Sequence, residues 1–531
     1  MNVMNLMESP ECDVVVAGAG PVGLTLACEL ATAGTRVLVL ERRTEVDRTI
    51  KAGAINTPSA EAFYRRGLLP ALAEIQKEAL GRFSSFAAGA GPAVTPAPRF
   101  AGHFAAIPLP ADLFDAGDPE FGNAGPAADV GLVPQEPLER LLGERAAALG
   151  VEVRRGVTLT GFDADDADDA DDADDAGVTV HTDAGPVRTR WLVGCDGGRS
   201  TVRKLAGFAF PGTDPEITGR QALVEMTGAE ALGRGWQTTG TGHYVHGPMP
   251  GRVLTVEFDG PPADRESPVT AREIEDSLRR VTGADVTVTA VHTATRFTDN
   301  ARQASTYRKG RVLLAGDAAH VHSPFGGQGL NLGIGDAMNL GWKLAATVRG
   351  WAPDGLLDTY TAERHPIGAW VLEWTRAQVA VMRPDPHARA LRTVVRDLIG
   401  TVEGTTHFVK RISGVWQRYD LPGDHPLTGR SAPDLAFADG SRLGDHLHHG
   451  RALLVGLHDD PELRASAEGY GGRVEVIAAA CPDRLGLAAL LVRPDGVVAW
   501  AADGDGDGDR EGLGAALRRW FGEPDQAAAA A

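Results

Sequence analysis

The chain has 531 residues, which is enough for two or three domains. With 43% hydrophobic and 23% charged residues, it has the composition of an ordinary globular protein. Its net charge of −19 argues against nucleic acid or an anionic membrane as a partner, because both are polyanions. No apolar run reaches the roughly 18–20 residues that a membrane span needs, and the N-terminus lacks the apolar core of a secretory signal. The four cysteines lie far apart, so we expect reduced thiols in a cytoplasmic protein and no metal site.

The first forty residues predict a strand, a glycine turn, a helix and a second strand. Residues 13–17 are apolar, a helical repeat runs on to Gly34, and a second apolar run over 37–40 ends at Glu41. The turn contains three glycines of the spacing that permits close approach to a pyrophosphate: Gly18, Gly20 and Gly23. Glu41 can accept hydrogen bonds from a ribose and would repel a phosphate there. The unit therefore predicts a site for FAD or NAD in preference to NADP.

The middle and end of the chain change character several times. Residues 82–130 show no clear period, whereas residues 207–300 contain alternating stretches typical of an antiparallel sheet. Strands over 151–160 and 178–182 flank an acidic tract, Asp163 to Asp175, which we expect to be a solvated loop. The last hundred residues predict another α/β unit, with strands over 452–457, 474–478 and 490–492.

Two further motifs each join a strand to a glycine-rich turn. A strand from Trp191 leads into Asp196 and Gly197, which alone resembles a hairpin turn. An apolar strand from Arg311 leads to Gly316 and Asp317, and a second glycine cluster then opens another helix. Two glycine-rich helix starts about three hundred residues apart suit one long, bent cofactor, held at its pyrophosphate by the first and at its redox ring by the second.

In this order, the three motifs resemble those of the flavin monooxygenases related to para-hydroxybenzoate hydroxylase. The resemblance covers residues 12–375 and, more loosely, the rest of the chain. It implies an α/β protein with a Rossmann-type FAD-binding domain, an interleaved antiparallel-sheet substrate domain and a C-terminal thioredoxin-like α/β domain. The expected ranges are 1–100, 131–206 and 301–420 for FAD-binding parts and connecting helices, 101–130 and 207–300 for the substrate domain, and 421–531 for the thioredoxin-like domain.

The resemblance also implies which residues bind FAD. The glycine motif would hold the ADP half, the Gly-Asp segment would meet the ribityl chain, and the helix start after Pro324 would stabilise negative charge on the reduced flavin. The implied cofactor-binding residues are Gly18, Gly20, Pro21, Val22, Gly23, Glu41, Arg42, Lys51, Gln135, Leu159, Asp196, Gly316, Asp317, Pro324, Gly327, Gly329, Leu330 and Asn331.

The sequence departs from the family in two places. Many relatives carry an arginine within the segment that matches residues 52–59, and Pro58 takes its place here. Lys51 or Arg48 could supply a cation near the flavin instead. The thioredoxin-like domain contains only Cys481 and no redox pair, so we expect that domain to be structural.

The implied activity is insertion of one oxygen atom from dioxygen into an aromatic polyketide, with NADPH or NADH as a transient co-substrate of the flavin. The closest likeness is to actinobacterial hydroxylases that tailor such compounds. No catalytic side chain is implied, because the cofactor carries the reactivity.

A phenolic substrate needs ring contacts and a proton acceptor, and the candidates are His103, Trp236, Tyr244, His246 and Phe325. His320 and His322 are expected to make structural hydrogen bonds. We expect a monomer or homodimer.

Three alternatives stay open. A Baeyer–Villiger oxygenase would use the same scaffold to insert oxygen beside a ketone. A flavin-dependent halogenase would need a tryptophan-isoleucine-proline signature and a tunnel lysine, and neither is evident. A redox-inactive flavoprotein that only binds a polyketide is disfavoured by the intact glycines and Asp317.

Overall fold

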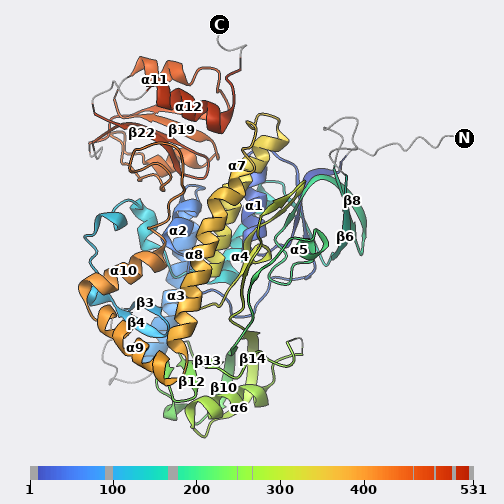
Figure 1. Cartoon of the computed structure of the whole chain (residues 1–531), viewed down its shortest axis with the longest axis vertical. Helices are drawn as coiled ribbons and strands as arrows, with labels where there is room; N and C mark the ends of the chain where they lie inside the picture. The colour runs from blue at the N-terminus through green and yellow to red at the C-terminus, as the bar shows by residue number, and fades with distance from the viewer. Residues whose placement is uncertain are drawn as a thin grey trace, which may run out of the picture.

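The computed structural model describes residues 10–89, 100–165, 177–247, 249–265, 267–458, 460–482, 486–504 and 510–525. Two long helices, α7 (Gln328–Val348) and α8 (Thr359–Met382), run through the middle of the molecule, with a C-terminal α/β domain at one end and an antiparallel sheet at the other (Figure 1). None of the described helices is both long and apolar enough to cross a membrane.

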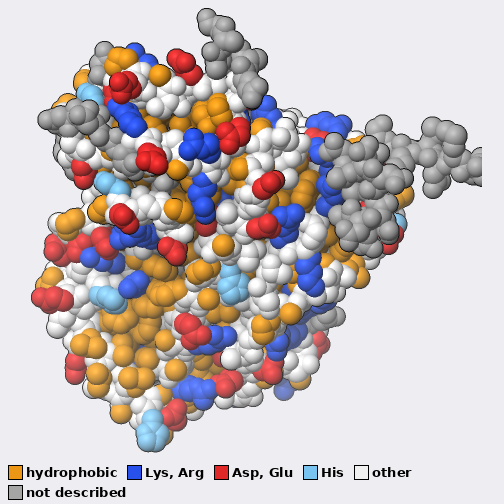
Figure 2. All heavy atoms as spheres, turned by 45° about the horizontal axis from the view of Figure 1, so that its top comes forward, with side chains coloured by type: hydrophobic (Ala, Val, Ile, Leu, Met, Phe, Trp, Pro, Cys, Tyr) orange, Lys and Arg blue, Asp and Glu red, His pale blue; other side chains and the backbone are white. Residues whose placement is uncertain are grey.

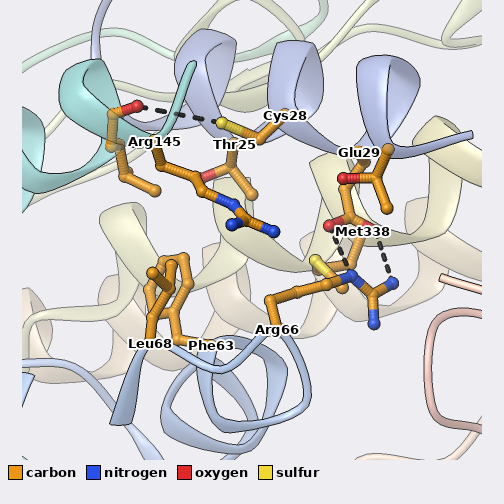
Figure 3. A pocket seen from close by; sticks show the side chains of 10 residues that line it. Thr25, Cys28, Glu29, Phe63, Arg66, Leu68, Arg145 and Met338 are labelled. Carbon is orange, nitrogen blue, oxygen red and sulfur yellow. Dashed lines mark hydrogen bonds and ion pairs between the residues drawn. The ribbon is translucent and has the colours of Figure 1, made fainter. Parts of the chain in front are cut away.

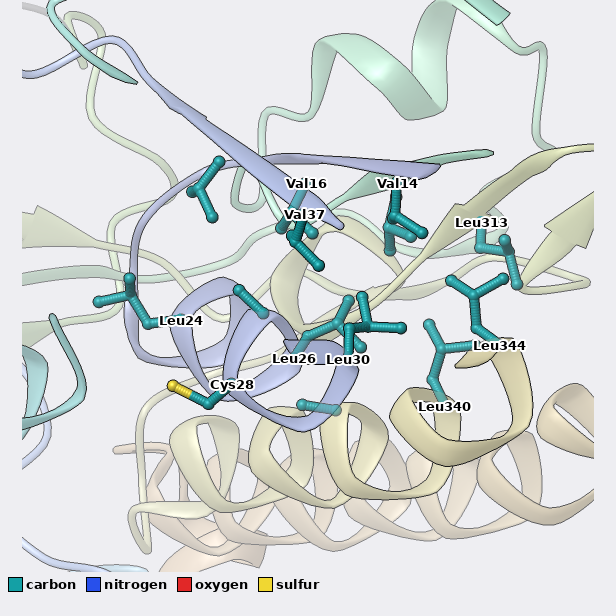
Figure 4. Close-up of a cluster of buried hydrophobic side chains, with 14 of the residues drawn as sticks. Val14, Val16, Leu24, Leu26, Cys28, Leu30, Val37, Leu313, Leu340 and Leu344 are labelled. Carbon is teal, nitrogen blue, oxygen red and sulfur yellow. The ribbon is translucent and has the colours of Figure 1, made fainter. Parts of the chain in front are cut away.

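The first sheet has the strand order β16-β17-β8-β1-β2-β5, and the five strands from β17 to β5 are parallel neighbours. Its strands are β1 (Cys12–Ala17), β2 (Val37–Glu41), β5 (Glu152–Arg155), β8 (Gly185–Gly194), β16 (Arg308–Lys309) and β17 (Val312–Leu314), and the pair β6 (Leu159–Ala164) and β7 (Val178–Thr182) extends β8. Helices α1 (Pro21–Thr32) and α7 pack side by side on one face of this sheet. Val14 and Val16 of β1 meet Leu26 and Leu30 of α1 there (Figure 4).

The first strand, helix and second strand lie within a residue or so of the predicted positions. The single strand expected over 151–160 is wrong: the chain forms β5 and β6 instead. Gly156, with a φ of +74°, turns the chain between them, so that β5 pairs with β2 and β6 pairs with β7. The acidic tract begins within β6, at Asp163, and its residues 166–175 lie outside the described ones.

Helices α2 (Thr57–Tyr64), α3 (Leu69–Gly89) and α4 (Gln135–Ala148) complete the first half of the chain. Between α3 and α4, the region without a clear period begins as the last turns of α3 and then forms a hairpin of β3 (Phe100–Phe104) and β4 (Ile107–Pro110). Short α5 (Thr201–Leu205) follows β8.

The antiparallel sheet expected within 207–300 is present. Its order is β11-β12-β13-β10-β14, and α6 (Ala271–Thr282) covers one face. The strands are β10 (Thr218–Thr227), β11 (Gly235–Thr238), β12 (Gly242–His246), β13 (Arg252–Glu257) and β14 (Thr287–Phe297). A small third sheet joins β9 (Gly212–Thr213), β15 (Ala301–Gln303) and β18 (His320–Val321).

The other face of this sheet packs with the β3/β4 hairpin and the end of α8 in one apolar cluster. Helices α9 (Pro386–Ile399) and α10 (Val402–Ser413) flank the hairpin. Large apolar side chains on their outer side are exposed: Leu391, Val394, Leu398 and Val402. The view in Figure 2 shows hydrophobic side chains spread over its lower left, on the side where α9 and α10 lie in Figure 1.

The C-terminal domain has a four-stranded sheet of order β20-β19-β21-β22, in which β19 and β20 are parallel and the other neighbours are antiparallel. This is the strand order of the thioredoxin-like unit that the sequence predicts. Its elements are β19 (Ala452–Gly456), α11 (Pro461–Ser466), β20 (Val474–Ala478), β21 (Leu487–Val492), β22 (Val498–Asp503) and α12 (Arg510–Phe521). Cys481, the cysteine of this domain, is buried.

Buried charges join this domain to the first. Arg66 donates to both carboxylate oxygens of Glu29 on α1, at 2.8 and 2.6 Å (Figure 3). It also donates to the carbonyls of Leu447 and Pro494 in the C-terminal domain. The pocket beside this pair has a volume of about 10 Å³. That is no more than one water molecule needs, so the pocket is a packing defect and not a ligand site.

Candidate functional site

The opening glycine turn is built for close backbone approach. Gly18 has a φ of +110°, and a Cβ there would overlap the carbonyl oxygen of Cys195. A Cβ at Gly23 would overlap the carbonyl oxygen of Gly18 itself. Helix α1 then begins at Pro21, and no side chain caps its N-terminus. Its first N–H groups therefore suit an anionic ligand such as a phosphate.

Glu41, at the end of β2, braces this turn. Its Oε2 accepts a hydrogen bond from the backbone N–H of Ala19 at 2.8 Å, and its Oε1 accepts one from that of Arg43 at 2.9 Å. A carboxylate oxygen can accept a further bond. The side chain can therefore hold the turn and still receive a ribose hydroxyl.

A cavity of about 330 Å³ opens over the carboxyl ends of β1, β2 and β8. This is the edge at which doubly wound sheets bind nucleotides. Eight predicted cofactor-binding residues line it: Gly18, Gly20, Glu41, Arg42, Lys51, Gln135, Leu159 and Asp196. The structure thus brings together residues that lie up to 178 positions apart in sequence.

Asp196 has one carboxylate oxygen that is free to accept a hydrogen bond from a ligand. Its Oδ2 accepts from the N–H groups of Thr201 and Val202 and so caps α5, at 2.7 and 3.2 Å. Its Oδ1 is buried at the cavity and has no hydrogen-bond partner among the described residues. A buried acceptor left unpaired is costly, so this atom fits a donor from a bound ligand, such as a ribose or ribityl hydroxyl of FAD.

Charged residues outside the predicted FAD contacts also line the cavity: Arg43, Glu45, Asp47, Glu139, Arg155 and Arg199. Lys51 contacts the Asp47 carboxylate at 2.7 Å. Although burial favours the neutral acid, the hydrogen bonds from Lys51 and Thr49 hold the pKa of Asp47 well below its usual range. The sequence could have indicated Arg155, because this residue ends β5, the strand that pairs with β2.

Of the two cations considered near the flavin, only Lys51 lines the cavity. Arg48 is exposed and pairs with Glu45 at 3.5 Å. Pro58 lies at the start of α2, where Asn56 caps the helix by accepting from Ser59 N–H. Lys51 is therefore the cation that stays a candidate.

The third motif lies directly behind the first. The side chain of Val22 fills the space beside Gly316 and Gly333, and a Cβ at either glycine would press on it. Arg203 bridges the second and third motifs by donating to the carbonyls of Gly198 and Ala318 at 2.9 and 2.8 Å. All three motifs thus form one continuous surface.

The remaining predicted FAD contacts gather at the start of α7. Asp317 is exposed, and its carboxylate faces Gly329 and His322. Gly327, with a φ of +63°, precedes the helix, whose N-terminus has no side-chain cap. Asn331 is occupied within the protein, because its Oδ1 accepts from Asn56 N–H at 2.8 Å and its Nδ2 donates to the Gly327 carbonyl. Gly316, Pro324 and Leu330 lie in the same region.

Three of the five candidate substrate residues come together. His103 and Trp236 have ring centroids 4.9 Å apart, and Trp236 and Phe325 lie 6.2 Å apart. Phe325 follows the exposed Pro324 beside the start of α7. Burial lowers the pKa of His103 to about 4, and its buried Nδ1 has no partner among the described residues. His103 is therefore a neutral imidazole, able to share a proton with a phenol.

The other two candidates, Tyr244 and His246, do not join this aromatic group, because they lie on the opposite face of the sheet. Tyr244 packs in the cluster under α6, and its hydroxyl accepts from Gly233 N–H at 3.0 Å. The period of two in a strand places His246 on the same face. His320 and His322 make hydrogen bonds to Asp336 and to the Ser323 carbonyl.

Comparisons with known proteins agree with this geometry. Residues 11–375 match the FAD binding domain family, and residues 425–524 match the C-terminal domain of aromatic-ring hydroxylases. The 12-dehydrotetracycline 5-monooxygenase/anhydrotetracycline 6-monooxygenase of Streptomyces rimosus is 41% identical over 541 residues, covering 96% of this chain and 99% of the relative. The dialkyldecalin synthase of Streptomyces rugosporus is 39% identical over 522 residues, covering 96% and 98%.

Among solved structures, the OxyS anhydrotetracycline hydroxylase from Streptomyces rimosus has a TM-score of 0.80 and 40% identity, with 97% of this chain and 99% of that chain covered. The family matches span most of the chain, and the relatives align over nearly their whole length. The chain therefore belongs to the family of FAD-dependent monooxygenases that join an FAD-binding domain to an aromatic-ring hydroxylase C-terminal domain.

Proposed function

We propose that this protein uses FAD, NAD(P)H and dioxygen to hydroxylate a polycyclic aromatic polyketide, in the biosynthesis of a natural product. One observation carries the proposal: Val22 packs between Gly316 and Gly333, so the turns for the two ends of one FAD adjoin each other. The relatives named for tetracycline intermediates support the substrate class.

Bound FAD supplies the electron transfer from nicotinamide and the reaction with dioxygen. The chain's own residues bind and orient the reactants. Asp196 and Glu41 would receive hydroxyls of the cofactor, and the uncapped starts of α1 and α7 would face its negative charge.

The aromatic residues beside Phe325 would exclude water and contact the substrate ring. The neutral His103 imidazole would accept or share the proton of a phenol, which would make the ring more electron-rich. We further propose that the protein is cytoplasmic, a compartment in which thiols stay reduced, and that it is a monomer or homodimer.

A second candidate is ring formation without net oxidation, in which FAD has no redox role. The 39% identical dialkyldecalin synthase favours it, because that relative is named as a synthase on the same scaffold. Baeyer–Villiger insertion beside a ketone is the third outcome to test.

One experiment separates these functions. The purified protein is checked for flavin absorbance and then incubated with NADPH and ¹⁸O₂ on a panel of angucycline- and anthracycline-like phenols, with product structures solved by NMR. Hydroxylation gives NADPH loss and one ¹⁸O on a ring carbon. A new lactone carbonyl would indicate Baeyer–Villiger insertion, and an isomer formed without NADPH loss would indicate the synthase. NADPH oxidation that never yields an oxygenated product contradicts the proposal.

A further inference from the structure

A buried chain of hydrogen bonds leads from the third motif toward the C-terminal domain. Asp336 of α7 accepts from the backbone N–H of Gly316 at 3.0 Å through Oδ2, and from Arg364 Nε at 2.9 Å through Oδ1. His320 also bonds to Oδ2, at 2.6 Å. The side chain of Asp336 is fully buried and that of Arg364 is 2% exposed. The conformation of the Gly316–Asp317 turn therefore depends on where Asp336 is held.

Arg364 is fixed in turn by two groups. Its Nη2 donates to the Leu332 carbonyl within α7, and its Nη1 donates to the hydroxyl of Tyr419 at 3.1 Å. Tyr419 lies after α10, in the connector that leads into the C-terminal domain. Its N–H donates to the Gly429 carbonyl, and Gly429 N–H donates to the Val498 carbonyl of β22, so the connector is tied to the C-terminal sheet.

Two arginines lie near the ring of Tyr419. The guanidinium carbon of Arg364 is 5.9 Å from the ring centroid, and that of Arg493, in the C-terminal domain, is 5.6 Å away. Arg493 forms a double ion pair with Glu363, the residue before Arg364, at 3.0 and 2.8 Å. Both partners of this pair are almost fully buried. The C-terminal domain thus binds α8 at Glu363, the residue next to the one that bonds to Asp336.

We infer that Tyr419 and Arg364 are positioning residues, through which the C-terminal domain sets the Gly316–Asp317 turn and so the affinity of the protein for FAD. The inference rests on the proposed contact of that turn with FAD. It gives the C-terminal domain, which has no redox cysteine pair, a role in the cofactor site. The domain would act by holding Asp336 in the geometry that the turn requires, without touching the cofactor.

The test is FAD titration of deflavinated full-length protein, followed by flavin fluorescence, together with thermal unfolding. Tyr419→Phe keeps the ring, and with it the ring contacts of both arginines. It removes only the hydroxyl that accepts the hydrogen bond from Arg364. We expect its FAD dissociation constant to rise roughly five- to tenfold, because only part of the energy of one buried hydrogen bond to a charged group is transmitted to the turn that meets the cofactor. The spectrum of the bound flavin should shift as well, which a purely structural role for Tyr419 would not cause.

Tyr64→Phe is the matched control, because it removes another tyrosine hydroxyl from the same domain interface, one that contacts Asp434 at 3.4 Å. It should leave FAD affinity unchanged. Arg364→Lys should weaken FAD binding, and adding Tyr419→Phe to it should have no further effect. Additive effects, or wild-type affinity in Tyr419→Phe, would overturn the inference. A wild-type protein that binds no FAD would instead overturn the proposed function.

Discussion

At the scale of the residue, Gly23 is the position where one methyl group should abolish cofactor binding. Its virtual Cβ overlaps the Gly18 carbonyl, so Gly23→Ala must displace the turn that faces the phosphates. We expect the variant to fold but to purify with little or no flavin, as measured by visible absorbance per mole of protein. Gly143→Ala on α4 is the control, because a Cβ there meets nothing within 4 Å. Full flavin content in Gly23→Ala would contradict the assignment.

The buried His243 makes the free energy of unfolding depend on pH. Despite its hydrogen bond to the Met382 carbonyl, burial lowers its pKa to about 4, below the unfolded value of roughly 6.5. Between these values the unfolded chain binds a proton that the folded chain does not. Stability therefore falls as the pH drops from 6.5 to 4. In urea unfolding over this range, His243→Gln should show a slope shallower by up to about 1.4 kcal/mol per pH unit. The exposed His449→Gln should match the wild type, and equal slopes for all three proteins would refute the prediction.

At the scale of the element, the β3/β4 hairpin depends on neighbours to hold an unfavourable turn. Ala105 and Ala106 both have positive φ, 49° and 61°, where an L residue costs roughly 1–2 kcal/mol. Both are buried, and Arg392 of α9 donates to both of their carbonyls. Gln378 of α8 accepts from Ala105 N–H and donates to the Phe325 carbonyl, which links the turn to the proposed substrate group.

Arg392→Met should therefore strain this turn. Two buried carbonyls would lose their donors, and we expect the free energy of unfolding to fall by about 1–3 kcal/mol in urea titration. Arg389→Met, an exposed position on the same helix, should change it by no more than about 0.5 kcal/mol. If the two variants are equally stable, Arg392 does not support the hairpin.

The elements that sequence could predict are those whose signal is local. The strand, glycine turn and helix around Gly18 follow from period and from the need for a residue without a side chain. The Ala105–Ala106 turn could not be predicted, since its sequence lacks the Asn or Gly typical of such turns and depends on distant partners. Period two places Tyr244 and His246 on one face, but only the fold shows that α6 covers it. Asp336 and Arg364 meet across two helices, which no spacing rule indicates.

At the scale of the whole molecule, a buried ion pair joins the two domains. Breaking this pair should lower the stability of the protein more than breaking an exposed pair. Arg66→Met would leave the Glu29 carboxylate buried without its cation and free two carbonyls of the C-terminal domain. Breaking one side of a buried pair costs about 3–5 kcal/mol, whereas an exposed pair contributes at most about 1 kcal/mol.

The matched comparison is Arg36→Met, which breaks an Arg–Asp13 pair whose arginine is 61% exposed. In urea unfolding, Arg66→Met should lose several times more stability than Arg36→Met, and limited proteolysis should cut it first in the connector near residue 420. Glu29→Gln combined with Arg66→Met should recover part of the loss, because no charge then stays buried alone. Equal losses for Arg66→Met and Arg36→Met would show that the domains are held by apolar packing around Trp342 and Trp520 instead.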